Sequence, residues 1–220
     1  MKNIGKLLGL DVKLIKPYWK WCVLFLAIAL FFSVINRDGA VFIVVFAMLS
    51  ASVMAFPFEF TCKSNLNVLY ATLPTNRKTL LVARFGFMLV TLVLMLVISV
   101  ATSLVIDLIF GNEISWRMMA FFVCVAFGMF LVMTGFQTPF FYKFGYAKGR
   151  IFMWIPTVLI IVALNLPLLF SLLPGEIEFN IFEWAFGNVN LAKAVAVASG
   201  LVVFVISYLV SRRIYLRKDF

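Results

Sequence analysis

Six long apolar runs alternate with short polar connections along this chain. The runs cover residues 18–35, 40–58, 80–110, 118–141, 151–173 and 191–210. A helix of about 20 apolar residues is long enough to cross the hydrocarbon core of a bilayer. The pattern therefore predicts an all-helical integral membrane protein, with one transmembrane domain over residues 1–220 and six membrane-spanning helices.

The composition agrees with lipid as the main solvent and excludes several kinds of chemistry. The chain is 65% hydrophobic and 13% charged, with a mean hydropathy of +1.10, which is too apolar for a water-soluble domain of this size. Histidine is absent, and this removes the usual general base and zinc ligand. Cys22, Cys62 and Cys124 lack the spacing of a metal site or a disulfide framework. The sequence therefore predicts no enzyme, no metal and no cofactor in this chain.

Lysine and arginine determine the expected orientation, because they collect on the cytoplasmic side of membrane proteins. With six spans, only three of the 19 basic residues fall on one side, namely Arg37, Arg117 and Lys193. The other side, which holds both termini, Cys62 and the connection 142–150, is predicted to be cytoplasmic. The net charge of +10 then reflects topology and attraction to anionic lipid rather than nucleic-acid binding.

Two surface segments are expected to lie in the membrane interfaces. Residues 1–17 combine lysines with a face of Ile4, Leu7, Leu8 and Ile15, which is typical of a basic interfacial helix. No small-residue cleavage site follows the first apolar run, so a cleaved signal peptide is not expected. The outer connection 174–190 is too apolar for a free loop and is expected to dip into the interface through its aromatic residues, Phe182, Trp184 and Phe186.

The inner connection contains a short amphipathic helix in the stretch NVLYATLPTNRKTLLVARF, residues 67–85. Its apolar residues follow a spacing of i, i+3, i+4 and i+7, which marks one helical face; they are Leu66, Leu69, Tyr70 and Leu73. The predicted helix, 65–73, begins near Asn65 and ends before Pro74, because a residue that precedes proline disfavours helical geometry. Asn76, Arg77 and Lys78 then start the third span, whose 31 residues would extend about 46 Å.

The centres of the spans are nearly free of charge. Glu59, Arg84 and Asp107 lie near span ends, where we expect their side chains to reach the headgroups. Most neutral polar residues in the spans are expected to bond to their own backbone or to a neighbouring helix. Those that could instead line a translocation path are Thr102, Ser103 and Asn165.

The inner connection resembles that of permease subunits of ABC-2 type exporters. The resemblance rests on the leucine–proline turn followed by basic residues, here Leu73, Pro74, Arg77 and Lys78, and the likeness to exporters of phenol-soluble modulins and other peptides is looser. It implies an elbow helix before span one and a half-dipping segment between spans five and six. It also implies a coupling helix that docks on an ATPase through residues from 65–73, namely Asn65, Leu66, Asn67, Leu69, Tyr70 and Leu73.

The resemblance further implies the partners and the cargo. Two copies of a cytoplasmic ATPase, which bind ATP and Mg, would drive a dimer of permeases made of identical or related chains. Spans two and five would line a path for amphipathic or hydrophobic cargo, peptides included, in the cell membrane of a bacterium. Two alternatives stay open: the substrate-binding membrane subunit of a vitamin-type importer, and a passive membrane or immunity protein.

Overall fold

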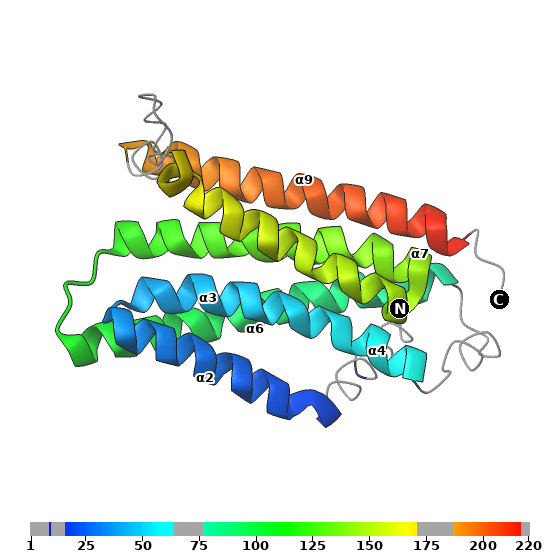
Figure 1. Cartoon of the computed structure of the whole chain (residues 1–220), viewed down its shortest axis with the longest axis horizontal. Coiled ribbons are helices and arrows are strands. Elements are labelled where there is room, and N and C mark those ends of the chain that lie inside the picture. The colour runs from blue at the N-terminus through cyan, green and yellow to red at the C-terminus, as the bar shows by residue number, and fades with distance from the viewer. Residues whose placement is uncertain (1–8, 10–15, 64–76, 171–186, 217–220) are drawn as a thin grey trace.

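Every described element of the protein is a helix. The computed structural model describes Gly9 and residues 16–63, 77–170 and 187–216. Within these ranges, five helical stretches are long and apolar enough to cross a membrane, which confirms the predicted all-helical membrane class. The helices run side by side, so that the corners between them gather at the two ends of the bundle (Figure 1).

A tight corner joins the first two long helices. The 3-10 turn η1 (Lys16–Tyr18) leads into α2 (Trp19–Asn36), and α3 (Gly39–Ala51) follows after two residues. Arg37 adopts a left-handed conformation with φ 55° and ψ 34° and ends α2. The Asp38 side chain then accepts a hydrogen bond from the Ala40 N–H at 2.8 Å. A left-handed residue ends a helix and an aspartate caps the next one, so Arg37 and Asp38 together reverse the chain.

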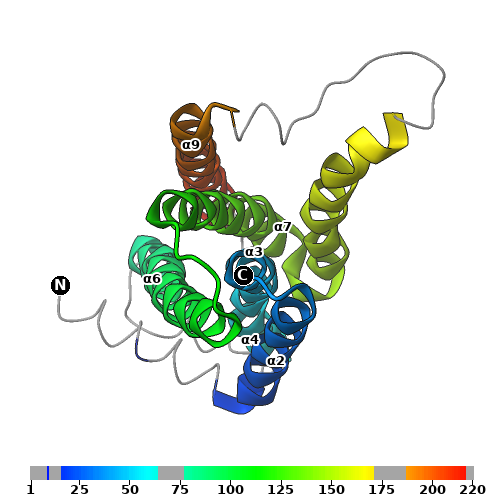
Figure 2. The ribbon, with the colours of Figure 1, turned by 90° about the vertical axis from the view of Figure 1, so that its left-hand side faces the viewer.

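The second span is not one continuous α-helix. After α3 the chain tightens into the 3-10 segment η2 (Ser52–Ala55) and resumes as α4 (Phe56–Lys63). Pro57 lies in the first turn of α4, where a missing backbone N–H is tolerated. In the end view α3 lies centrally (Figure 2), in contact with α2, α6 and α7.

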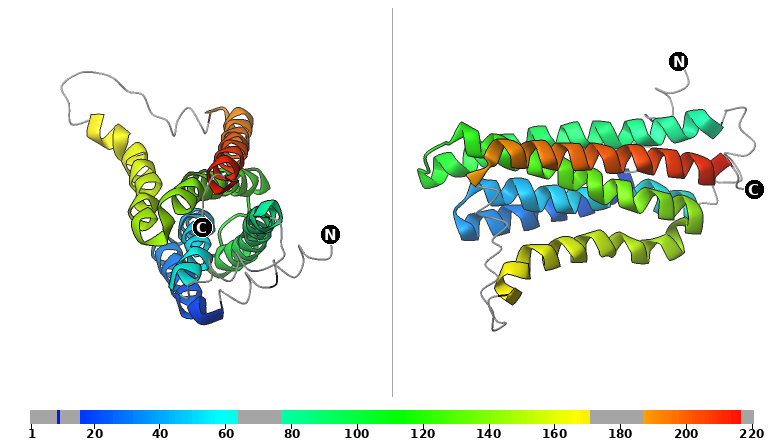
Figure 3. Two further views of the ribbon diagram at one scale, coloured as in Figure 1. Left: turned by 90° about the vertical axis from the view of Figure 1, so that its right-hand side faces the viewer. Right: turned by 90° about the horizontal axis from the view of Figure 1, so that it is seen from above.

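Two long helices follow, and the second is folded back on itself. The helix α6 (Arg77–Phe110) has 34 residues and extends about 51 Å. The helix α7 (Trp116–Phe170) is interrupted only at Gly145, with φ 72° and ψ 173°. Its two arms, 116–144 and 146–170, return along the bundle as a hairpin (Figure 3). The predicted connection 142–150 is therefore wrong in extent, since the chain stays helical on both sides of Gly145.

The last helix packs along the first arm of α7. The two run in the same direction, and α9 (Val189–Leu216) passes so close that glycine is required at the contact. A Cβ atom added to Gly128 would lie 2.3 Å from the carbonyl oxygen of Ala196, and one added to Gly200 would lie 2.9 Å from Gly128 Cα. Small residues permit such close approach of helices in membranes.

Several predicted segments fall wholly or partly outside the described residues. The interfacial helix 1–17 is described only at Gly9 and η1, and the inner helix 65–73 and the outer aromatic segment 182–186 lie in undescribed ranges. The predicted fifth span, 151–173, coincides up to Phe170 with the second arm of α7. That arm is not among the five candidate spans of the described chain, so a count of six spans stays a prediction.

Candidate functional site

Polar side chains meet at the end of the bundle where α2 turns into α3. The Gly39 N–H, at the start of α3, donates to Asp107 Oδ1 on α6 at 3.0 Å. The Asn112 side-chain amide donates to the Arg37 carbonyl at 2.7 Å and to Asp107 Oδ1 at 3.3 Å. These bonds connect the α2–α3 corner with the α6–α7 loop. The Asp107 carboxylate was expected to reach the headgroups; the structure adds that it completes the hydrogen bonding of two chain segments.

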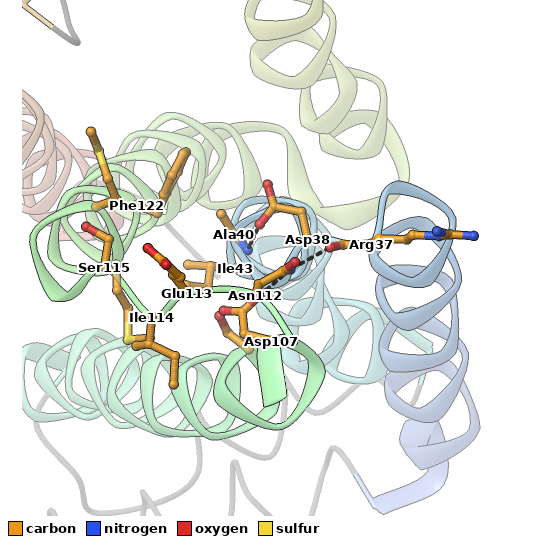
Figure 4. A pocket seen from close by; sticks show the side chains of 13 residues that line it. Arg37, Asp38, Ala40, Ile43, Asp107, Asn112, Glu113, Ile114, Ser115 and Phe122 are labelled. Atoms are coloured by element: carbon orange, nitrogen blue, oxygen red, sulfur yellow. Dashed lines mark hydrogen bonds between the residues drawn. The ribbon is translucent and has the colours of Figure 1, made fainter. Parts of the chain in front are cut away.

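A cavity of about 500 Å³ opens beside this junction, and we call it the corner cavity. Its walls come from the α2–α3 corner, the end of α6 and the start of α7 (Figure 4). One part of the lining is polar and includes Asp38, Ser103, Asp107 and Glu113, and another part is apolar. Its size lies within the range of pockets that hold small organic ligands.

Gly39 allows the start of α3 to approach α6 closely at the corner cavity. A Cβ atom at this position would lie 2.6 Å from both the carbonyl and the hydroxyl oxygen of Ser103, and 2.7 Å from Asp107 Oδ2. Glycine therefore allows α3 to begin directly against α6. This close approach brings the hydroxyl of Ser103 and the carboxylate of Asp107 to the cavity wall.

A second polar cluster lies at the opposite end of the bundle, and we call it the Arg84 cluster. Arg84 on α6 is only 5% exposed. Its guanidinium donates to the Thr61 hydroxyl on α4 at 2.8 Å and lies 4.3 Å from the centre of the Phe58 ring. Nearby, the Tyr146 hydroxyl donates to Glu59 Oε2 at 3.0 Å. The cluster therefore ties α4 to α6 and to the second arm of α7.

The sequence interpretation of Arg84 was wrong. Its side chain was expected to reach the headgroups but turns inward, where the Thr61 hydroxyl accepts a hydrogen bond and the Phe58 ring attracts the cation. Glu59, for which headgroup contact was also expected, is half-buried and accepts a hydrogen bond from Tyr146. Thr61 and Tyr146 were not singled out at all, since a hydroxyl in an apolar run has no sequence signal of its partner. The only available hint was the presence of opposite charges near the ends of consecutive spans.

The Arg84 cluster includes residues from the two helices that flank the segment predicted to couple to an ATPase. Helix α4 ends at Lys63 and α6 begins at Arg77, while the segment's predicted contacts and turn lie outside the described residues: Asn65, Leu66, Asn67, Leu69, Tyr70, Leu73, Pro74 and Asn76. The predicted launch residues Arg77 and Lys78 form the first turn of α6. The two helices that flank the segment are thus hydrogen-bonded to each other.

The three residues proposed for a translocation path have different surroundings. Ser103 is 1% exposed and lines the corner cavity. Thr102 is half-buried on α6 and is not part of that lining, and Asn165 belongs to the second arm of α7. Two of the other polar span residues bond to their own helix: Ser99 donates to the Leu96 carbonyl at 3.0 Å and Thr134 to the Phe130 carbonyl at 2.7 Å.

Aromatic rings hold the α7 hairpin around Gly145. Phe152 stacks on Phe140 with ring centres 4.5 Å apart and on Phe144 at 5.6 Å. A Cβ atom at Gly149 would lie 2.8 Å from the Phe141 side chain. The turn thus depends on one glycine for its conformation and on another for close packing.

Comparison with known proteins identifies the family. A family model described as ABC-2 family transporter protein matches residues 6–216. Neither the curated proteins nor the solved structures include a match. The family match spans nearly the whole chain, from before α2 to the last residue of α9, and agrees with the bundle of apolar helices. The chain therefore belongs to the ABC-2 family of transporter proteins.

Proposed function

We propose that this chain is the membrane permease subunit of an ATP-driven exporter. The observation that carries the proposal is the family match over residues 6–216, which implies a transport subunit that works in a membrane with an ABC ATPase. The described helices supply the apolar bundle that such a subunit needs. In this proposal ATP and Mg bind to two copies of the partner ATPase.

The proposed orientation places the Arg84 cluster near the cytoplasm. In the described chain Arg37 follows α2, and Arg117 and Lys193 lie in the first two turns of α7 and α9, at the same end of the bundle (Figure 1). The opposite end carries Lys63, Arg77 and the Gly145 turn with its neighbouring lysines. The positive-inside rule then favours a cytoplasmic Arg84 cluster and an outward-facing corner cavity.

The proposed coupling helix, 65–73, belongs to the stretch of chain between α4 and α6, so in this proposal its movement would reach several helices. The segment that contains it connects α4 to α6, and the bond between Thr61 and Arg84 joins these helices one to two turns away from it. The Tyr146–Glu59 bond extends the connection to α7. A displacement of the segment by an ATPase would therefore move three helices together, and α6 runs the full length of the bundle (Figure 1).

The cargo path is proposed to form between two permease copies. The second arm of α7 exposes large apolar side chains, among them Trp154, Val158 and Leu159, and corresponds to the predicted fifth span. The resemblance pairs this span with span two along the path, but within one copy the α3 part of span two is covered by α2, α6 and α7, so the second arm of α7 is the wall that this copy exposes. Apolar walls of this kind suit amphipathic or hydrophobic cargo, because the apolar part of such cargo brings no unpaired charge into an apolar environment.

The proposal is tested by co-expression with an ATPase of the same transporter and by ATPase measurements in proteoliposomes. A Leu69→Asp/Tyr70→Asp variant places charge on the apolar face of the coupling helix. It should insert normally yet lose both stimulation of the ATPase and transport. A matched Leu69→Met/Tyr70→Phe variant keeps the face apolar and should retain both activities. Normal transport by the aspartate variant would refute the assignment of 65–73.

The same preparation separates the alternatives. An exporter accumulates cargo inside inverted vesicles when ATP is supplied, whereas an importer subunit accumulates it in right-side-out vesicles. A passive membrane or immunity protein would neither co-purify with an ATPase nor change its rate.

A further inference from the structure

We propose that the corner cavity binds an organic cation in which a primary amine or guanidinium is joined to an apolar group. The inference goes beyond the transport function and concerns this chain alone, so it can be tested without the ATPase. It rests on the charge of the cavity, the hydroxyl of a buried serine that forms no hydrogen bond within the described residues, an apolar wall and the size of the space.

The charge of the cavity is negative. Asp38, Asp107 and Glu113 contribute carboxylates, and among the described residues of the lining Arg37 is the one that is basic. Figure 4 shows the Arg37 guanidinium directed away from the carboxylates, while its backbone carbonyl accepts from Asn112. A cation that enters would therefore meet three negative charges. Asp107 is partly buried, so electrostatic attraction there is stronger than in bulk water, whereas Asp38 and Glu113 are exposed and contribute less.

Ser103 provides the second, independent observation. Its side chain lines the cavity and is 1% exposed, yet its hydroxyl has no hydrogen-bond partner within the described part of the chain. Neighbouring hydroxyls in the bundle do bond to their own helices, as Ser99 does. Buried polar groups are nearly always paired, so the hydroxyl is available to an N–H donor from a ligand.

Another part of the lining is apolar and suits the remainder of such a ligand. Ile43 from α3 and Met118, Met119 and Phe122 from the first arm of α7 form it. Methionine adapts to ligands of different shape, and an aromatic face attracts cations. A cavity of about 500 Å³ has room for a small amphiphile rather than for an ion alone.

The carboxylates do not form a metal site. Among the described residues, no group of three or more acidic or cysteine side chains is arranged to hold a metal ion. Two of the carboxylates are also engaged with the backbone, since Asp38 caps Ala40 and Asp107 accepts from Gly39. The acids are spread around a wide opening, which favours a multi-atom cation over a compact divalent one.

The test uses the purified full-length chain in lipid nanodiscs and isothermal titration calorimetry, with empty nanodiscs as the blank. The probe is 4-phenylbutylamine, compared with the neutral 4-phenyl-1-butanol and with Ca²⁺. We expect saturable binding of the amine only. Glu113 is exposed and forms no hydrogen bond within the described residues, so Glu113→Gln should fold normally and weaken amine binding about three- to fivefold. Glu113→Asp keeps the charge and should bind within about twofold of the parent.

Ser103→Ala gives the sharper result, because it should weaken ligand binding and leave the stability of the unliganded protein unchanged. Loss of one hydrogen bond should weaken amine binding about fivefold, while the thermal midpoint without ligand stays the same. Equal affinity for the amine and the alcohol would overturn the proposal. So would amine binding that neither Glu113→Gln nor Ser103→Ala weakens, or the absence of saturable heat at millimolar amine.

Discussion

The guanidinium of Arg84 donates a hydrogen bond to the Thr61 hydroxyl at 2.8 Å and so joins the helix before residues 64–76 to the helix after them. Thr61 in turn donates to the carbonyl of Pro57 at 2.6 Å. A positive charge at a 5% exposed position is costly unless it is paired. The Arg84–Thr61 pair therefore joins α4 to α6, and its removal should lower stability. In the proposed mechanism it should also weaken coupling to the ATPase.

Replacement of Thr61 tests this pair directly. Thr61→Val keeps the shape of the side chain and removes one acceptor of the Arg84 guanidinium, so we expect a loss of about 1–3 kcal/mol in the free energy of unfolding. The measurement is equilibrium unfolding of the purified protein in mixed micelles. Thr91→Val is the matched control on α6, because the Thr91 hydroxyl bonds only to its own helix at Phe87. Equal losses in both variants would contradict the proposed role of the pair.

The Tyr146–Glu59 bond connects the second arm of α7 to α4. Tyr146→Phe deletes the donor to a carboxylate and should cost about 1.5–3 kcal/mol. The matched control is Tyr208→Phe, because the Tyr208 ring packs against Phe85 and its hydroxyl has no hydrogen bond within the described chain. The two variants are compared by the same unfolding assay. A control as destabilised as Tyr146→Phe would show that the hydroxyl bond adds nothing.

The contact between α7 and α9 predicts a graded response to added methyl groups. At Gly128 the new Cβ would meet backbone, 2.3 Å from the Ala196 carbonyl oxygen, whereas at Gly135 it would first meet the end of the Val203 side chain at 3.0 Å. Gly128→Ala should therefore cost about 1–3 kcal/mol, and Gly135→Ala less. Gly187→Ala is the control, since no atom of the described residues lies within 4 Å of its added Cβ. A reversed order of stabilities would contradict this packing.

Hydrophobic patterning predicted the helices well but not their breaks or their contacts. Apolar runs bounded by polar residues determined where α2, α6 and α9 lie, because lipid imposes the same length and polarity on any spanning helix. The 3-10 break at η2 lies just before Pro57. The chain reversal expected over 142–150 takes place at the single residue Gly145. Such features have no periodic signal.

The candidate site was predicted still less completely. Ser103 was singled out only as a polar residue in a span, and its place at the corner cavity follows from the close approach of α3 at Gly39. The inward turn of Arg84 depends on Thr61, which lies 23 residues away in sequence. Contacts between distant segments arise from the packing of helices, and a single sequence does not reveal them.

The proposed orientation predicts which cysteines can be labelled in intact cells. In a Cys22→Ser/Cys124→Ser background, Cys62 should resist a membrane-impermeant maleimide until the membrane is opened, because the basic residues favour a cytoplasmic location for α4's end. Glu113→Cys, combined with Cys62→Ser in that background, should react from outside, since Glu113 is exposed at the opposite end of the bundle. Labelling of Cys62 in sealed cells would show that the proposed orientation is inverted.

The hairpin of α7 depends on the backbone of Gly145. Its φ of 72° with ψ of 173° lies in a region that only glycine adopts without strain. Gly145→Ala should therefore lower the free energy of unfolding by about 1–3 kcal/mol. Ala147→Gly is the control: it lies two residues away, within the helical part of α7, and should cost about 1 kcal/mol or less. If the second arm moves relative to the bundle during transport, Gly145→Ala should also slow transport more than its loss of stability explains. A variant as stable and as active as the parent would show that another residue sets the turn.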